Sequence, residues 1–135
     1  MRVAQTVVVF VGGTVGTLIR AVIESIWPAT GWPWGTFLIN LSGSFVLGLF
    51  LTALVRSGGD TGWRRLARLG IGTGLLGGYT TYSTFILEGD LRLASGALGM
   101  AGAYLVGSVL LGTAAAAAGI LLARRLVPHK AGAAR

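Results

Sequence analysis

The sequence has no cysteine and only one histidine, His129, in 135 residues. Without cysteine there is no disulfide, no thiolate nucleophile and no thiolate metal site. A single histidine in the C-terminal tail cannot form the clusters that bind transition metals. No nucleophile with an adjacent base and no phosphate-binding glycine loop occurs, so we expect the protein not to be an enzyme.

Acidic residues are also scarce, and none lies inside a long apolar segment. Glu24, Asp60, Glu88 and Asp90 all fall near a segment end or in a loop. A proton-coupled exporter needs a titratable side chain inside the bilayer. The apolar segments here contain hydroxyls, an amide and aromatic rings instead, which favours passive passage of a small solute, particularly an anion that accepts hydrogen bonds.

Apolar residues, by contrast, are abundant: 53% of the chain is hydrophobic and 11% is charged. The charge-free stretches are Val3–Ile19, Ser25–Val55, Leu69–Leu87 and Leu93–Ala123. A membrane-spanning helix needs about 20 apolar residues. We therefore predict an all-α membrane protein with one domain, 1–127, followed by a basic cytoplasmic tail, 128–135. The four transmembrane helices are expected at about 3–26, 34–56, 66–87 and 94–123.

Basic residues are divided unevenly between the two sides of these predicted helices. One side has only Arg20 and Arg92. The other has nine: Arg2, Arg56, Arg64, Arg65, Arg68, Arg124, Arg125, Lys130 and Arg135. The positive-inside rule then places both termini in the cytoplasm of a multi-pass protein of the cell inner (plasma) membrane. The net charge of +7 is thus a topology signal, and no nucleic-acid partner is expected.

Small residues recur at a spacing of four, which places them on one face of a helix. They are Gly12 and Gly16, Ser44 and Gly48, and Gly70, Gly74 and Gly78. Such grooves allow helix backbones to touch within a membrane, so we expect close helix packing along these faces.

Hydrogen-bonding residues are also aligned: Thr36, Asn40 and Ser44 share one face, and Tyr104 and Ser108 another. Asn40 is the most informative of them, because its own helix cannot satisfy a carboxamide as it can a hydroxyl. Burying the amide without a partner costs a few kcal/mol. The sequence leaves open whether Asn40 joins two helices or lines a pore.

The stretch GLLGGYTTYSTF, Gly74–Phe85, combines helix-weakening glycines with β-branched threonines in the middle of the third predicted helix. We expect that helix to break at Gly77–Thr80, which frees carbonyl oxygens that can bind a hard cation such as Na⁺. Beyond the break, Tyr82 and Phe85 are three residues apart and hence adjacent. Their rings either pack ordinarily or present positive edges to an anion.

At these residues the chain resembles the CrcB/Fluc fluoride channels. Their third helix carries a glycine pair, TT, an aromatic residue, ST and phenylalanine. GTFLINLSGSFVLG, Gly35–Gly48, is similar to the family's second helix, and GTVGTLIR, Gly13–Arg20, to the end of its first. The resemblance covers nearly the whole chain. It implies a fluoride-selective channel that passes fluoride passively and lowers cytoplasmic fluoride. The family works as an antiparallel dimer with two pores and a structural Na⁺ that is not transported.

The resemblance also assigns roles to residues. Backbone oxygens of Gly77 and Thr80 are implied to hold the Na⁺, Arg20 is the basic residue of the first helix, and Glu88 lies near a pore mouth. The pore and anion-binding positions implied are Asn40, Tyr82, Ser83, Thr84, Phe85, Tyr104 and Ser108.

Two positions depart from the family pattern. The first pore aromatic is usually phenylalanine, but here it is Tyr82, whose hydroxyl adds bulk and a dipole to that pore. The polar track of the fourth helix usually continues one turn beyond Ser108, where this chain has Gly112.

The uneven basic residues bear on the partner. A subunit that inserts both ways should have almost no bias, so we favour a heterodimer with an oppositely oriented paralogue over a homodimer. Two other functions agree less well with the sequence. A small four-helix multidrug exporter needs an acid in the first helix, where Gly12, Gly13 and Gly16 stand instead. A non-transporting membrane assembly subunit explains the spaced glycines but not the aligned donors.

Overall fold

The computed structural model describes residues 2–27 and 31–128, and within these ranges every regular element is a helix. This confirms the all-helical fold class. The elements are α1 (Arg2–Ile26), α2 (Trp34–Arg56), α3 (Gly62–Ala67), the π-helix η1 (Arg68–Leu76), α4 (Gly77–Tyr79), α5 (Ser83–Ala94) and α6 (Leu98–Leu126). Apart from Pro128, the predicted basic tail lies outside the described residues.

Three of these helices, α1, α2 and α6, are long and apolar enough to cross a membrane. They contain 25, 23 and 29 residues. At 1.5 Å per residue each is longer than the hydrocarbon core of about 30 Å. The chain between α2 and α6 is divided into four shorter pieces, the longest of which is α5 with 12 residues.

The turn between α5 and α6 lies farther along the chain than we expected. We predicted a fourth helix from 94, but Ala94 still belongs to α5 and α6 begins at Leu98. Gly96 has a φ of +80°, and its amide donates to the carbonyl of Leu93, while the amide of Ala97 donates to the carbonyl of Arg92. This is the Schellman arrangement, in which a left-handed glycine closes a helix.

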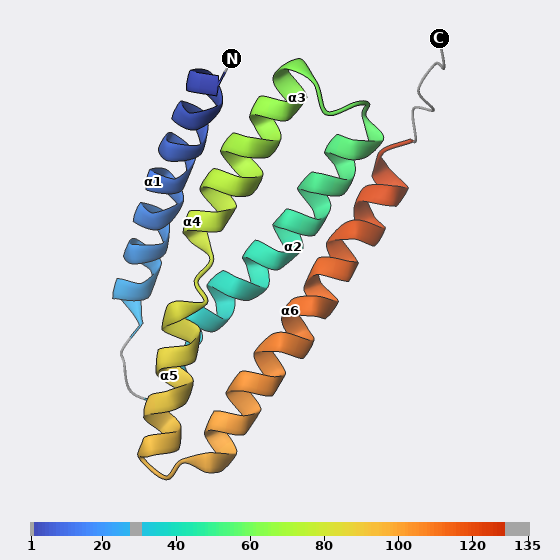
Figure 1. Ribbon diagram of the computed structural model, residues 1–135. Coiled ribbons are helices and arrows are strands. Elements are labelled where there is room, and N and C mark those ends of the chain that lie inside the picture. The colour runs from blue at the N-terminus through green and yellow to red at the C-terminus, as the bar shows by residue number, and fades with distance from the viewer. Residues whose placement is uncertain (1, 28–30, 129–135) are drawn as a thin grey trace.

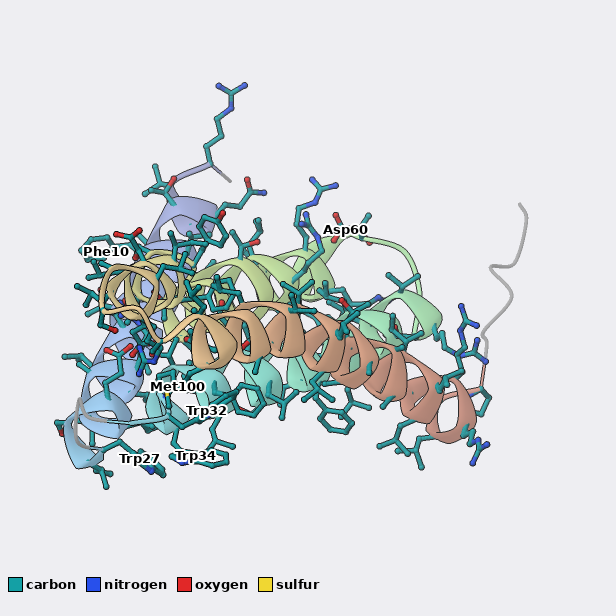
Figure 2. All side chains as sticks on the ribbon, turned by 90° about the horizontal axis from the view of Figure 1, so that it is seen from below. Phe10, Trp27, Trp32, Trp34, Asp60 and Met100 are labelled. Atoms are coloured by element: carbon teal, nitrogen blue, oxygen red, sulfur yellow. The ribbon has the colours of Figure 1, made fainter. Side chains whose placement is uncertain are left out.

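The helices lie in two pairs (Figure 1). One pair is α2 with α6, and the other is α1 with the continuous pieces η1 and α4. Below these, α5 packs against the first half of α6. The beginning of α1, the end of α6 and the connection between α2 and α3 share one end of the molecule, and the start of α2 and the connection after α5 lie toward the other. Trp27, Trp32 and Trp34 gather at this second end, around the start of α2 (Figure 2).

Glycine allows each pair to pack with its backbones in contact, as the spacing of small residues predicted. A Cβ placed on Gly16 of α1 would overlap the carbonyl of Leu75 in η1 and lie 2.8 Å from the amide nitrogen of Tyr79. In the other pair, a Cβ on Gly119 of α6 would overlap the carbonyl of Phe45 and lie 2.8 Å from the amide nitrogen of Leu49. The prediction of close packing is confirmed at Gly16 and at Gly48, where a Cβ would overlap the carbonyl of Ala116 on α6; Gly119 was not among the predicted glycines.

We expect the substitution Gly119→Ala to destabilise the protein by about 1–3 kcal/mol, because the methyl group forces α6 away from the α2 backbone. Gly107→Ala is the control on the same helix, since a Cβ there meets no atom within 4 Å. It should keep or slightly raise stability through its better helix propensity. Thermal unfolding followed by circular dichroism in detergent measures both, and an equal response of the two variants would contradict close packing at Gly119.

Candidate functional site

The helix formed by η1 and α4 ends at Tyr79, and helical structure resumes at Ser83. Thr80 is extended, with φ of −77° and ψ of 155°. The interruption therefore spans 80–82. Our expectation of a break at Gly77–Thr80 is right for Thr80 but wrong for Gly77–Tyr79, which form α4. The threonines rather than the glycines leave the helix here, and the Thr80 methyl group lies against Gly43 of α2.

Asn40 of α2 supports the interruption through both ends of its carboxamide. Its Nδ2 donates to the Thr81 carbonyl at 2.8 Å, and its Oδ1 accepts from the Thr81 amide at 2.9 Å. In a continuous helix the Thr81 amide would donate to the carbonyl of Gly77. Asn40 takes over this donor, so the Gly77 carbonyl loses its helical partner. The sequence left open whether Asn40 joins two helices or lines a pore. These two bonds show that it joins α2 to the segment between α4 and α5.

Hydroxyl groups begin the next helix. The Thr81 Oγ1 accepts the amide of Thr84 at 3.2 Å and donates to the Thr84 Oγ1 at 3.0 Å. The Ser83 Oγ lies 3.4 Å from the same Thr81 oxygen. An oxygen that accepts an amide three residues later acts as helix N-caps do. Thr81, which is buried, was missed by our residue assignment, although its place between two predicted site residues was the available signal.

The two predicted aromatic residues are neighbours but have different surroundings. The ring centroids of Tyr82 and Phe85 are 6.3 Å apart. Phe85 is buried and its ring lies 5.3 Å from that of Tyr104 on α6. Tyr82 is 76% exposed in the single chain. The Tyr82 ring thus faces outward and is available to the membrane or to a second subunit.

Glu88 connects three helices. Its Oε1 accepts the hydroxyl of Thr36 on α2 at 3.0 Å, and its Oε2 accepts the hydroxyl of Tyr104 on α6 at 2.7 Å. Thr36 and Tyr104 are both buried, so their hydroxyls and this carboxylate satisfy one another. Glu88 also borders a cavity of about 180 Å³ that contains Glu24 and Thr84 in its lining. The structure therefore brings the predicted mouth residue next to predicted pore residues.

Two arginines lie beside this site. Arg20, predicted from the first helix, donates from Nε to the carbonyl of Gly78 at 3.2 Å and lies 3.5 Å from the Glu24 carboxylate. Arg92 was not predicted; its Nη1 donates to the Glu88 carbonyl at 2.7 Å, and its guanidinium lies over the Tyr104 ring at 5.7 Å. Its spacing of four from Glu88 was a signal for contact on α5.

Ser108 and Gly112 extend one turn and two turns beyond Tyr104 on α6. The Ser108 Oγ is buried and has no hydrogen-bond partner among the described residues. Gly112 faces α2, because a Cβ placed on it would lie 3.7 Å from the Ser44 Oγ. The Ser44 hydroxyl of α2 therefore lies next to Gly112, where α6 carries no hydroxyl.

A metal site built from acidic or histidine side chains is not found within 2–27 and 31–128, where no three such residues cluster. Main-chain oxygens are the other possibility for a hard cation. The Gly77 carbonyl has lost its helical donor to Asn40, and the extended ψ of Thr80 turns its carbonyl out of the helix direction. These two oxygens are the main-chain groups at the interruption that a hard cation such as Na⁺ could use.

Comparison with known proteins identifies the family of this chain. Residues 7–120 match the family described as CrcB-like protein, Camphor Resistance (CrcB). The chain belongs to the CrcB/Fluc family. This is an ion-channel family, so the protein is not an enzyme, as predicted.

Curated relatives agree with this membership. The fluoride-specific ion channel FluC 1 of Cutibacterium acnes is 54% identical over 117 residues, which cover 85% of this chain and 77% of that protein. FluC of Phenylobacterium zucineum is 42% identical over 120 residues, covering 85% and 91%. FluC 2 of Nitrobacter hamburgensis is 43% identical over 122 residues, covering 87% and 95%.

We expect Asn40→Ala to lower stability by about 1–3 kcal/mol, because both backbone groups of Thr81 lose their partners in a water-poor site. Thr113→Ala is the control, since the Thr113 hydroxyl bonds only to the Val109 carbonyl of its own helix and is exposed. Thermal unfolding in detergent compares the two. If Asn40→Ala melts like Thr113→Ala, the carboxamide does not hold the interruption.

Proposed function

We propose that the protein is a fluoride-selective channel that passes fluoride passively across the membrane and thereby lowers cytoplasmic fluoride. The observation that supports this most is the 54% identity to the fluoride-specific channel of Cutibacterium acnes over 85% of this chain. The proposed pore lies where the structure gathers hydrogen-bond donors: beside the interruption between α4 and α5 and along the adjoining face of α6.

The chemistry of these donors suits fluoride. Fluoride is small and strongly hydrated, so a pore has to replace its water with other donors. Hydroxyls, an amide and the positive edges of aromatic rings do so without titrating near neutral pH. The proposed pore residues are Asn40, Tyr82, Ser83, Thr84, Phe85, Tyr104 and Ser108, with Glu88 at the mouth. The Ser44 hydroxyl, beside Gly112, would supply the donor that α6 lacks one turn beyond Ser108.

We infer a fourth membrane crossing from the short pieces η1, α4 and α5, interrupted at 80–82. Backbone groups at membrane depth are tolerated outside a helix only where protein supplies partners. Asn40 supplies them at Thr81, and Arg20 donates to the carbonyl of Gly78. This crossing would place both termini on the same side of the membrane.

The proposed cofactor is one structural Na⁺ held by the backbone oxygens of Gly77 and Thr80. Bound there, the cation would neutralise carbonyl dipoles and fix two subunits together; it is not transported. Two oxygens per chain complete a four-oxygen set only when a second subunit adds its own pair. We therefore propose an antiparallel dimer, whose interface would also cover the exposed Tyr82 ring.

The distribution of charge favours one orientation for this subunit. The described arginines beyond α1, except Arg92, lie either between the last residue of α2 and the first residue of η1 or at the end of α6. We propose that both termini are cytoplasmic in the plasma membrane and that the partner is an oppositely oriented paralogue, with a homodimer as the alternative. The multidrug exporter and the assembly subunit are not favoured by membership of an ion-channel family.

Flux tests the anion and the partner together. The cells express this chain together with a second copy, in which the basic residues are moved to the opposite loops. We expect inverted vesicles from these cells to pass fluoride rapidly but not chloride. Vesicles with either copy alone should stay near background, because an antiparallel pair cannot form. A fluoride electrode and a chloride electrode measure the two fluxes, and replacing Na⁺ with a large organic cation should reduce the fluoride flux.

The outcomes of this measurement separate the claims. Robust fluoride flux from the unaltered chain alone contradicts the obligate partner but supports the channel. No fluoride flux from any combination, with both proteins present in the membrane, contradicts the channel itself.

The topology of the chain can be tested by labelling introduced cysteines, because the chain has no cysteine of its own to react. We expect Ser95→Cys, in the turn between α5 and α6, to react with a membrane-impermeant maleimide added outside intact cells. Ser57→Cys, after α2, should react only in permeabilised cells. Equal partial labelling of both positions in intact cells would indicate dual insertion and favour the homodimer.

A further inference from the structure

A groove of about 390 Å³ opens between the ends of α2 and α6, away from the proposed pore. Its walls are Leu51, Thr52 and Val55 of α2, and its end is bordered by Arg56 and Arg124. Val55 is 69% exposed, so this wall faces the surroundings of the bundle. Nitrogen-bearing side chains project at this end of α6 (Figure 2).

Arg56 is held at the groove by its Nε, which donates to the carbonyl of Val127 just beyond α6 at 2.6 Å. This bond closes the end of the α2–α6 pair and anchors the guanidinium at the groove. The two terminal nitrogens of Arg56 have no side-chain hydrogen bond to the described part of the chain. A fixed guanidinium with free terminal nitrogens is well suited to a phosphate group.

Among the described residues, these arginines have no carboxylate partner. Asp60 is the one acidic residue in the connections at this end of the molecule. Both of its oxygens accept from Arg68, at 3.0 and 3.1 Å, and one lies 3.6 Å from Arg65. Hydrogen bonding from Arg68 lowers the pKa of Asp60, so its carboxylate stays ionised and engaged there. Within 2–27 and 31–128 the ion pairs involve neither Arg56 nor Arg124.

An apolar wall that ends at two unpaired arginines matches one kind of ligand. Acyl chains pack on leucine and valine at membrane depth, while arginines at the helix ends meet an anionic headgroup. From this geometry we propose that the groove binds one anionic phospholipid, whose phosphate is held by Arg56 and Arg124 and whose acyl chain lies along Leu51 and Val55. A free phosphate ion would use the arginines but leave the apolar wall uncovered.

The test compares two neighbouring arginines that carry the same charge. Arg124 borders the groove, whereas Arg125 is exposed at the same helix end and does not. Native mass spectrometry of the purified full chain in detergent, titrated with phosphatidylglycerol, gives the affinity for each variant. We expect Arg124→Gln to weaken binding of the first lipid about fivefold and Arg125→Gln to change it less than twofold. Thermal unfolding without lipid confirms that both variants are folded.

Two further titrations identify the ligand. Phosphatidylcholine, which has the same phosphate but no net charge, should bind at least fivefold more weakly than phosphatidylglycerol to the unaltered chain. Inorganic phosphate should not displace phosphatidylglycerol. Equal weakening by both substitutions, equal binding of the two lipids, or displacement by phosphate would each overturn the proposed site. None of these readouts involves fluoride, so the result is independent of the proposed channel function.

Discussion

The pair of hydrogen bonds between the Asn40 carboxamide and the Thr81 backbone is the interaction on which the site depends. A carboxamide has the same donor and acceptor as a peptide group, so it can replace the helical partner that Thr81 has lost. Without it, two backbone groups would be unpaired in a region that contains little water. The same bonds separate Thr81 from Gly77 and direct the chain into α5, whose first turn the Thr81 hydroxyl caps.

Close packing of the backbones is what brings Asn40 to Thr81. Glycines at the crossings of α1 with η1 and of α2 with α6 leave no room for a side chain. In a membrane, where apolar side chains gain little from leaving lipid, such contact is a main source of helix association. The interruption lies between the two pairs, and it is held from both: Asn40 reaches Thr81 from α2, and Arg20 reaches Gly78 from α1.

Charged residues are arranged differently at the two ends of the molecule. At the site end, Glu88 is surrounded by the Thr36 and Tyr104 hydroxyls, and Arg92 lies over the Tyr104 ring. At the other end, Asp60 is shared by Arg65 and Arg68, while Arg56 and Arg124 border an apolar groove. The Glu88 carboxylate and the Thr36 and Tyr104 hydroxyls therefore satisfy one another, whereas positive charge at the far end faces outward.

The sequence by itself determined the helical class, the apolar spans of α1 and α2, the spacing of the glycines and the family, because hydropathy, helical period and a specific motif are local properties. It also indicated a break near Gly77–Thr80, although the interruption lies at 80–82. Only the tertiary structure decided which residues leave the helix, since the Asn40 bond and the Gly43 contact come from α2. The partners of Glu88, the contact of Arg92 with Tyr104 and the groove at Arg56 were likewise beyond sequence reasoning, because each joins residues from helices far apart in the chain.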